Sequence, residues 1–136
     1  MDIFEEIKKL NFPKGEFIVV GSGIMAVKGI RDTNDLDIVV TPELFEKCKN
    51  DGWEINEWTK VGIEGKEWLK KGDVDVYAQL SRKNGSLSVE DLLKNSEEIN
   101  GISFITLEAL IDFKREYGRP KDFEDIKMIE DYILNN

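Results

Sequence analysis

Residues 17–40 read FIVVGSGIMAVKGIRDTNDLDIVV and place a glycine turn between two apolar segments. The first segment, Phe17–Val20, is too short for a helix and is rich in β-branched side chains, so it predicts a buried strand. Residues 21–23, Gly-Ser-Gly, interrupt this strand, and a short helix is expected from there to about Gly29. Leu36–Val40 predicts a second strand. The whole stretch therefore predicts a strand, a turn, a short helix and a second strand.

Two carboxylates, Asp35 and Asp37, lie on either side of Leu36 at the start of the second expected strand. Because side chains alternate along a strand, both carboxylates should point to the same face. Neighbouring carboxylates repel each other and are costly unless a cation lies between them. Oxygen ligands of this kind suit Mg²⁺ or Mn²⁺. The pair therefore predicts a divalent-cation site, with a calcium-stabilised strand edge as the weaker interpretation.

The order and spacing of these residues resemble a known motif. Gly21-Ser22, followed after twelve residues by Asp-Leu-Asp-Ile at 35–38, is similar to the nucleotidyltransferase motif of the polymerase β superfamily. Residues 31–34 resemble the basic-Thr turn of its small stand-alone members, and residues 118–126 resemble their Gly-Arg-Pro-Lys-Asp-x-x-Asp-Ile ending. The resemblance covers most of the chain and is weakest over residues 50–72. It implies one domain over residues 1–136 with an α/β (α+β) fold, a mixed β-sheet packed by helices, including two C-terminal helices.

Composition limits the function classes. A chain of 136 residues with 40% hydrophobic content can bury a core. The net charge of −9 provides no general attraction to nucleic acid or to an anionic membrane. There is no histidine, which excludes Ser-His-Asp chemistry and histidine-ligated zinc. The lone Cys48 fits a core position in a reducing cytosol, and no signal peptide or membrane-spanning run is recognised, so we expect a cytoplasmic protein.

Periodicity and capping signals predict the remaining elements. Strands are expected at 53–58, 66–69, 73–77 and 102–105, and residues 81–86 are expected to form a polar loop with its turn at Asn84-Gly85. Helices are expected over 3–10, after Thr41, after Ser88, from Thr106 to near Gly118, and from about Pro120. The tryptophans at 53, 58 and 68 either pack at the rim of the sheet or stack on a ligand.

A third carboxylate is expected beside the first two, because the superfamily that this chain resembles requires one on a neighbouring strand. Asp73, Asp75 and Tyr77 share one face of the strand expected at 73–77. Asp75 is the preferred candidate, since it lies between Val74 and Val76, where an ordinary solvent-facing aspartate is disfavoured. Asp73 at the strand entrance remains open.

The resemblance also implies roles for these carboxylates. Asp35 and Asp37 would bridge two metal ions, and Asp75 would complete the site of the ion on the nucleophile side. Asp75 would also help to take the proton from the acceptor hydroxyl. Two-metal sites of this type catalyse in-line displacement at phosphorus.

The triphosphate should meet a second group of residues. Gly21 and Ser22 would cradle the β- and γ-phosphates, because glycine allows close backbone approach and amides at a helix start attract anions. Arg31 and then Lys121 are the expected cationic contacts. Lys28 remains open, since a solvated surface position is equally consistent.

The sequence therefore predicts a metal-dependent nucleotidyltransferase that moves a nucleoside monophosphate from an NTP, expected to be ATP, to a hydroxyl of a small-molecule or protein acceptor. Basic residues occur only as dispersed pairs, which argues against a long nucleic acid as acceptor. A second copy of the chain or a small partner protein could complete the cleft. The alternative is a non-catalytic nucleotide-sensing or partner-binding domain of the same fold, such as one half of a two-component module.

Overall fold

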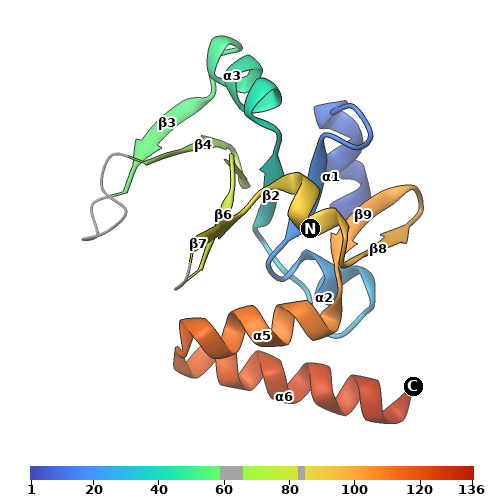
Figure 1. The fold of residues 1–136 in the computed structure, drawn as a ribbon. Helices are drawn as coiled ribbons and strands as arrows, with labels where there is room; N and C mark the ends of the chain where they lie inside the picture. Colours follow the sequence, from blue (N-terminus) through green and yellow to red (C-terminus); the bar gives the residue numbers. More distant parts are fainter. Residues whose placement is uncertain (59–65, 83–84) are drawn as a thin grey trace.

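A seven-stranded mixed β-sheet organises the computed structural model, which describes residues 1–58, 66–82 and 85–136 (Figure 1). The strand order is β3-β4-β5-β2-β1-β9-β8. The strands are β1 (Phe17–Val20), β2 (Leu36–Val40), β3 (Glu54–Glu57), β4 (Glu67–Lys71), β5 (Val74–Tyr77), β8 (Ser96–Ile99) and β9 (Ile102–Ile105). The two central strands, β1 and β2, are those predicted from residues 17–40, and their bounds agree with the prediction.

Six helices are described around this sheet (Figure 1). They are α1 (Ile3–Leu10), α2 (Gly23–Val27), α3 (Pro42–Asn50), α4 (Val89–Leu93), α5 (Leu107–Tyr117) and α6 (Pro120–Asn135). Figure 1 shows α5 and α6 side by side along one edge of the molecule, so the expected pair of C-terminal helices is present. None of the described helices is long and apolar enough to cross a membrane.

The predicted helix starts are confirmed by their caps. The hydroxyl of Thr41 accepts a hydrogen bond from the amide of Leu44 at 3.3 Å, and that of Thr106 accepts one from the amide of Ala109 at 3.1 Å. Ser88 begins α4 with a complete capping box. These side chains satisfy amides that the first turn of a helix leaves without a backbone partner.

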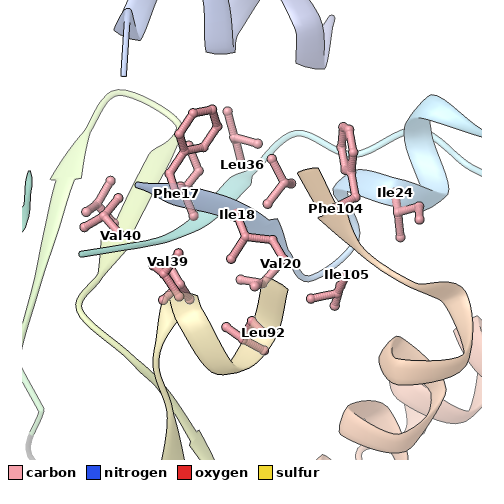
Figure 2. Close-up of a cluster of buried hydrophobic side chains, with 14 of the residues drawn as sticks. Phe17, Ile18, Val20, Ile24, Leu36, Val39, Val40, Leu92, Phe104 and Ile105 are labelled. Atoms are coloured by element: carbon pink, nitrogen blue, oxygen red, sulfur yellow. The ribbon is translucent and has the colours of Figure 1, made fainter. Parts of the chain in front are cut away.

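Both faces of the central strands are buried. β1 runs antiparallel to β2 and parallel to β9, and β2 runs parallel to β5. Figure 2 shows Phe17, Leu36 and Phe104 on the side of the sheet nearer α1, and Val39 on the opposite side near Leu92 of α4. Burial on both faces explains why β1 is a continuous apolar run and not an alternating one.

Two parts of the architecture differ from the prediction. Residues Leu80–Arg82 (β6) and Gly85–Leu87 (β7) form a two-stranded hairpin where a polar loop was expected, and Asn84 of the expected turn lies outside the described residues. Strand β8 was not predicted at all. Its sequence, SEEI, has no apolar alternation, and it forms because β9 provides the pairing edge. Both pairs join strands that are close in sequence, and the two-residue turn between β8 and β9 is Asn100-Gly101, both at positive φ.

Candidate functional site

A cleft of about 1020 Å³ is lined by the glycine turn, by the start of β2 and the end of β5, and by α5 and α6. The expected site residues that line it are Gly21, Ser22, Arg31, Asp35, Asp37 and Lys121. Asp75 is not among its lining residues. Six of the seven expected site residues, which lie far apart in the sequence, therefore meet at one cleft.

Gly21 is held close to one of the carboxylates. Its φ angle is +64°, and a Cβ atom at this position would lie 2.9 Å from Oδ2 of Asp37. Any side chain here would be strained by the backbone conformation and would also collide with the carboxylate. The glycine turn is thus shaped so that its backbone runs directly beside Asp37.

Asp37 and Asp75 lie opposite each other on the parallel strands β2 and β5. Burial is the largest cause that raises the pKa of Asp37 to about 6, followed by the charges of Asp75 and Asp35. The Tyr77 hydroxyl donates a hydrogen bond to Oδ1 of Asp37 at 3.4 Å and partly opposes this rise. The negative charges of Asp75 and Asp35 thus act on Asp37 in addition to its burial.

The chemistry of this group fits a divalent cation, because hard oxygen donors with uncompensated negative charge are what Mg²⁺ and Mn²⁺ bind. As the side chains stand, no three Asp, Glu, Cys or His residues within the described ranges are arranged to hold a metal ion. Asp75 is instead engaged by Lys70, whose ammonium donates to Oδ1 at 3.3 Å. The carboxylates thus have the right chemistry and strand positions, while Lys70 supplies a protein cation beside one of them.

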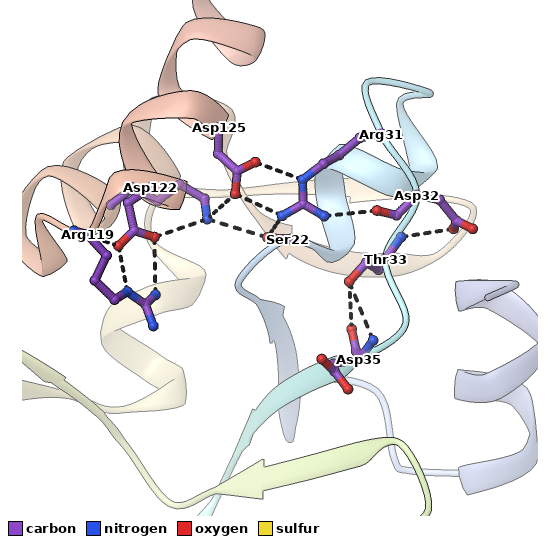
Figure 3. A network of polar contacts seen from close by, with 9 residues as sticks. Ser22, Arg31, Asp32, Thr33, Asp35, Arg119, Asp122 and Asp125 are labelled. Atoms are coloured by element: carbon purple, nitrogen blue, oxygen red, sulfur yellow. Dashed lines mark hydrogen bonds and ion pairs between the residues drawn. The ribbon is translucent and has the colours of Figure 1, made fainter.

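Arg31 belongs to a polar network that lines the cleft (Figure 3). Its Nε and Nη2 atoms donate to the two carboxylate oxygens of Asp125 at 2.7 and 2.8 Å, and Nη2 also donates to the Ser22 hydroxyl at 2.9 Å. Burial alone would raise the pKa of Asp125, but hydrogen bonds from Arg31 and Lys114 outweigh it and hold this pKa at about 2. The guanidinium that was expected to meet the triphosphate is therefore largely occupied by a protein carboxylate.

Lys114 is the site residue that the sequence interpretation missed. Its side chain is buried on α5, and its ammonium contacts Asp125 at 2.8 Å, Asp122 at 3.7 Å and the Ser22 hydroxyl at 3.4 Å. The residue also lines the cleft. A lysine on the buried stripe of an amphipathic helix was the available signal, because a lysine is rarely buried without a partner.

The other basic residues are placed differently. Arg119 forms a two-point ion pair with Asp122, whose side chain is fully buried. Lys28 forms an ion pair with Glu97 of β8 at 2.8 Å, at the edge of the sheet. Lys121 is exposed at the cleft. Lys121 is therefore the expected cationic contact that remains available to a bound anion.

The three tryptophans have separate environments. Trp53 is buried against Phe12, with ring centroids 6.2 Å apart. Trp58 lines the cleft and packs on Trp68 with a centroid separation of 4.6 Å. One of the three thus packs in the core, and a tryptophan pair lies at the rim of the cleft.

No family model matches the sequence, and no curated protein matches it. Among solved structures, the chain is similar to the crystal structure of ANT(2″)-Ia in complex with adenylyl-2″-tobramycin. The match has a TM-score of 0.53 and 15% sequence identity, and it covers 96% of this chain and 85% of that chain. At this identity the likeness concerns the fold alone. It shows the fold expected from the sequence, a nucleotidyltransferase-like mixed sheet packed by helices with two helices at its C-terminal end.

Proposed function

We propose that the protein is a metal-dependent nucleotidyltransferase, which transfers a nucleoside monophosphate from an NTP to a hydroxyl group and releases pyrophosphate. The observation that carries this proposal is the pairing of Asp37 with Asp75 on adjacent parallel strands, with the backbone of Gly21 against Asp37 in the same cleft. The similarity of fold to ANT(2″)-Ia supports it.

The carboxylates Asp35, Asp37 and Asp75 would hold Mg²⁺ or Mn²⁺. When bound, such ions neutralise charge on the triphosphate and make the acceptor hydroxyl more acidic. Asp75 would help to accept the proton that leaves this hydroxyl as its oxygen attacks the α-phosphate. Asp37 is half-buried at the cleft, and the protein around it strengthens its interaction with any cation by lowering the local dielectric constant.

The glycine turn would bind the phosphate chain. Gly21 lets the backbone approach closely, and Ser22 presents a hydroxyl at the cleft. Lys121 would contribute an exposed positive charge from the start of α6. Positioning and charge neutralisation of this kind account for most of the catalysis of phosphoryl transfer.

We infer a small-molecule or protein acceptor and ATP as the donor. The cleft is large for a single nucleotide and leaves room for an acceptor beside it. The solved neighbour holds an adenylylated small molecule, tobramycin, which supports testing small alcohols first. The acidic net charge of −9 argues against a long nucleic acid.

Pyrophosphate release tests the proposal. Each of the four NTPs would be incubated with Mg²⁺ and a panel of hydroxyl acceptors, with chelator and the Asp37→Asn variant as negative controls. Metal-dependent release that Asp37→Asn abolishes would support the proposal. Nucleotide binding without turnover across the panel would favour the non-catalytic alternative, which the engagement of Asp75 by Lys70 also favours. A protein that neither binds nor turns over any NTP would refute both catalysis and nucleotide sensing, whereas a partner-binding role requires no nucleotide.

A further inference from the structure

The hydroxyl of Ser22 has an unusual set of neighbours. It accepts hydrogen bonds from Nη2 of Arg31 at 2.9 Å and from the ammonium of Lys114 at 3.4 Å (Figure 3). Although Ser22 precedes α2, whose residues are all described, its side chain makes no capping bond to that helix. A hydroxyl has two acceptor lone pairs and one hydrogen to donate. Since both bonds are made to the oxygen, the hydrogen is left to donate elsewhere, and Ser22 lines the cleft.

Asp125 holds both of the cationic donors in place. It receives two parallel hydrogen bonds from Arg31 and one from Lys114 at 2.8 Å, and its side chain is only 8% exposed. Two-point arginine–carboxylate pairs fix orientation as well as distance. The positions of the two groups that surround Ser22 therefore depend on a single carboxylate of α6, which is distant from Ser22 in the sequence.

Charges balance in the buried part of the network. Arg31 and Lys114 are paired there with Asp122 and Asp125, whereas the Arg119 side chain is 54% exposed and its charge is largely solvated. Ser22 and Lys114 both line the cleft, and the Lys114 ammonium lies 3.4 Å from the Ser22 hydroxyl. An anion bound at this point would therefore meet both side chains.

We propose that Asp125 is a positioning residue that, through Arg31 and Lys114, orients the Ser22 hydroxyl as a hydrogen-bond donor to the phosphate chain of the nucleotide. Arg31 donates to Ser22, to Asp125 and to the backbone carbonyl of Asp32, so its guanidinium is engaged by the protein itself. This inference rests on the proposed function, because the anion is the phosphate chain of the NTP. It assigns α6 a part in shaping the glycine turn, beyond its packing on α5.

A double-mutant cycle tests the inference with magnesium tripolyphosphate as the probe. Binding to the full chain would be measured by calorimetry for the wild type, Asp125→Asn, Ser22→Ala and the double variant, at one fixed excess of Mg²⁺. Each single variant should bind about tenfold more weakly, the size expected for a lost hydrogen bond to a charged group. The double variant should bind no more weakly than Ser22→Ala alone, because Asp125 acts through Ser22. Glu124→Gln, one residue away and exposed, removes the same charge and should change affinity less than twofold.

Losses that multiply in the double variant would overturn the inference, because Asp125 would then act independently of Ser22. Ser22→Ala keeps every ion pair, so it should fold even where Asp125→Asn does not, and unchanged affinity in Ser22→Ala would also overturn the inference. A wild type that does not bind tripolyphosphate would overturn it as well. Coupled binding without pyrophosphate release from any NTP would support the inference and refute the proposed function. Pyrophosphate release together with multiplicative losses in the double variant would support the proposed function and overturn the inference.

Discussion

Asp37→Asn should stabilise the metal-free protein, and by an amount that depends on pH. The pKa of Asp37 is raised from 3.8 to about 6, mainly by burial and then by Asp75 and Asp35. The native state therefore binds this proton more tightly than the unfolded chain does. Below about pH 4 the carboxyl is protonated in both the native and the unfolded state, so it does not change the free energy of unfolding. As the pH rises through 6, the native state must ionise a carboxyl in a buried, acidic environment, and stability is lost.

The shift is about two pH units, which corresponds to about 3 kcal/mol. Asparagine has nearly the same shape but no charge, and its side-chain oxygen can still accept the hydrogen bond from Tyr77. The variant should match the wild type near pH 4 and exceed it by about 3 kcal/mol near pH 8. For a chain of this length the difference corresponds to roughly 10 °C in Tm.

Urea unfolding in the presence of chelator, at several pH values from 4 to 8, measures this difference directly. The absence of histidine removes the residue that ordinarily titrates in this window. Asp131→Asn, an exposed change on α6, serves as the control and should leave the pH profile unaltered. Parallel stability curves for Asp37→Asn and the wild type would refute the assignment of a buried, electrostatically strained carboxylate. A loss of stability in the variant at pH 8 would refute it as well.

Three further results are expected. Gly21→Ala should destabilise the protein by more than about 1 kcal/mol and abolish nucleotide binding, because the added Cβ would collide with Asp37. Gly29→Ala is the control: it has open space around it, so thermal unfolding should show only the cost of its backbone conformation. Asp75→Asn should reduce pyrophosphate release severely and Asp73→Asn only slightly; equal, near-wild-type rates would place the third carboxylate elsewhere. Lys70→Met should increase the Tm shift produced by Mg²⁺, because it removes the ammonium 3.3 Å from Asp75; a smaller shift than in the wild type would show that Lys70 supports metal binding and does not oppose it.

Local signals account for most of the secondary structure. Caps at Thr41, Ser88 and Thr106 are short-range interactions within four residues, so the sequence alone predicts where those helices begin. Strand β1 is recognisable because it is buried on both faces and therefore reads as a continuous apolar run. Strand β8 has no such run, and the local signal for it is the Asn100-Gly101 turn that joins it to β9.

The chemistry of the candidate site also follows from residue type and spacing. The alternating Asp35 and Asp37 predict a cation by themselves, whereas the phosphate-binding role of Gly21-Ser22 is implied by the family resemblance. Which partners the charged groups take is a different matter. Arg31 lies on the loop before the aspartates and was expected to face the triphosphate, yet Asp125, 94 residues away, engages it. Lys114 falls on the same side of its helix as Leu107, Leu110 and Ile111, and the folded structure brings it to the cleft beside Asp125 and Ser22.

The difference between the features that the sequence predicts and those that it does not has one physical cause. Helix caps, strand alternation and the glycine turn depend on interactions between residues close in sequence, whose geometry the backbone dictates. Ion pairs depend on which distant side chains the folded chain brings within about 4 Å, and a charge in the sequence does not specify its partner. The sequence by itself therefore determined the strand–turn–strand unit and its carboxylates, whereas the tertiary structure decided that Arg31 and Lys114 converge on Asp125 behind Ser22.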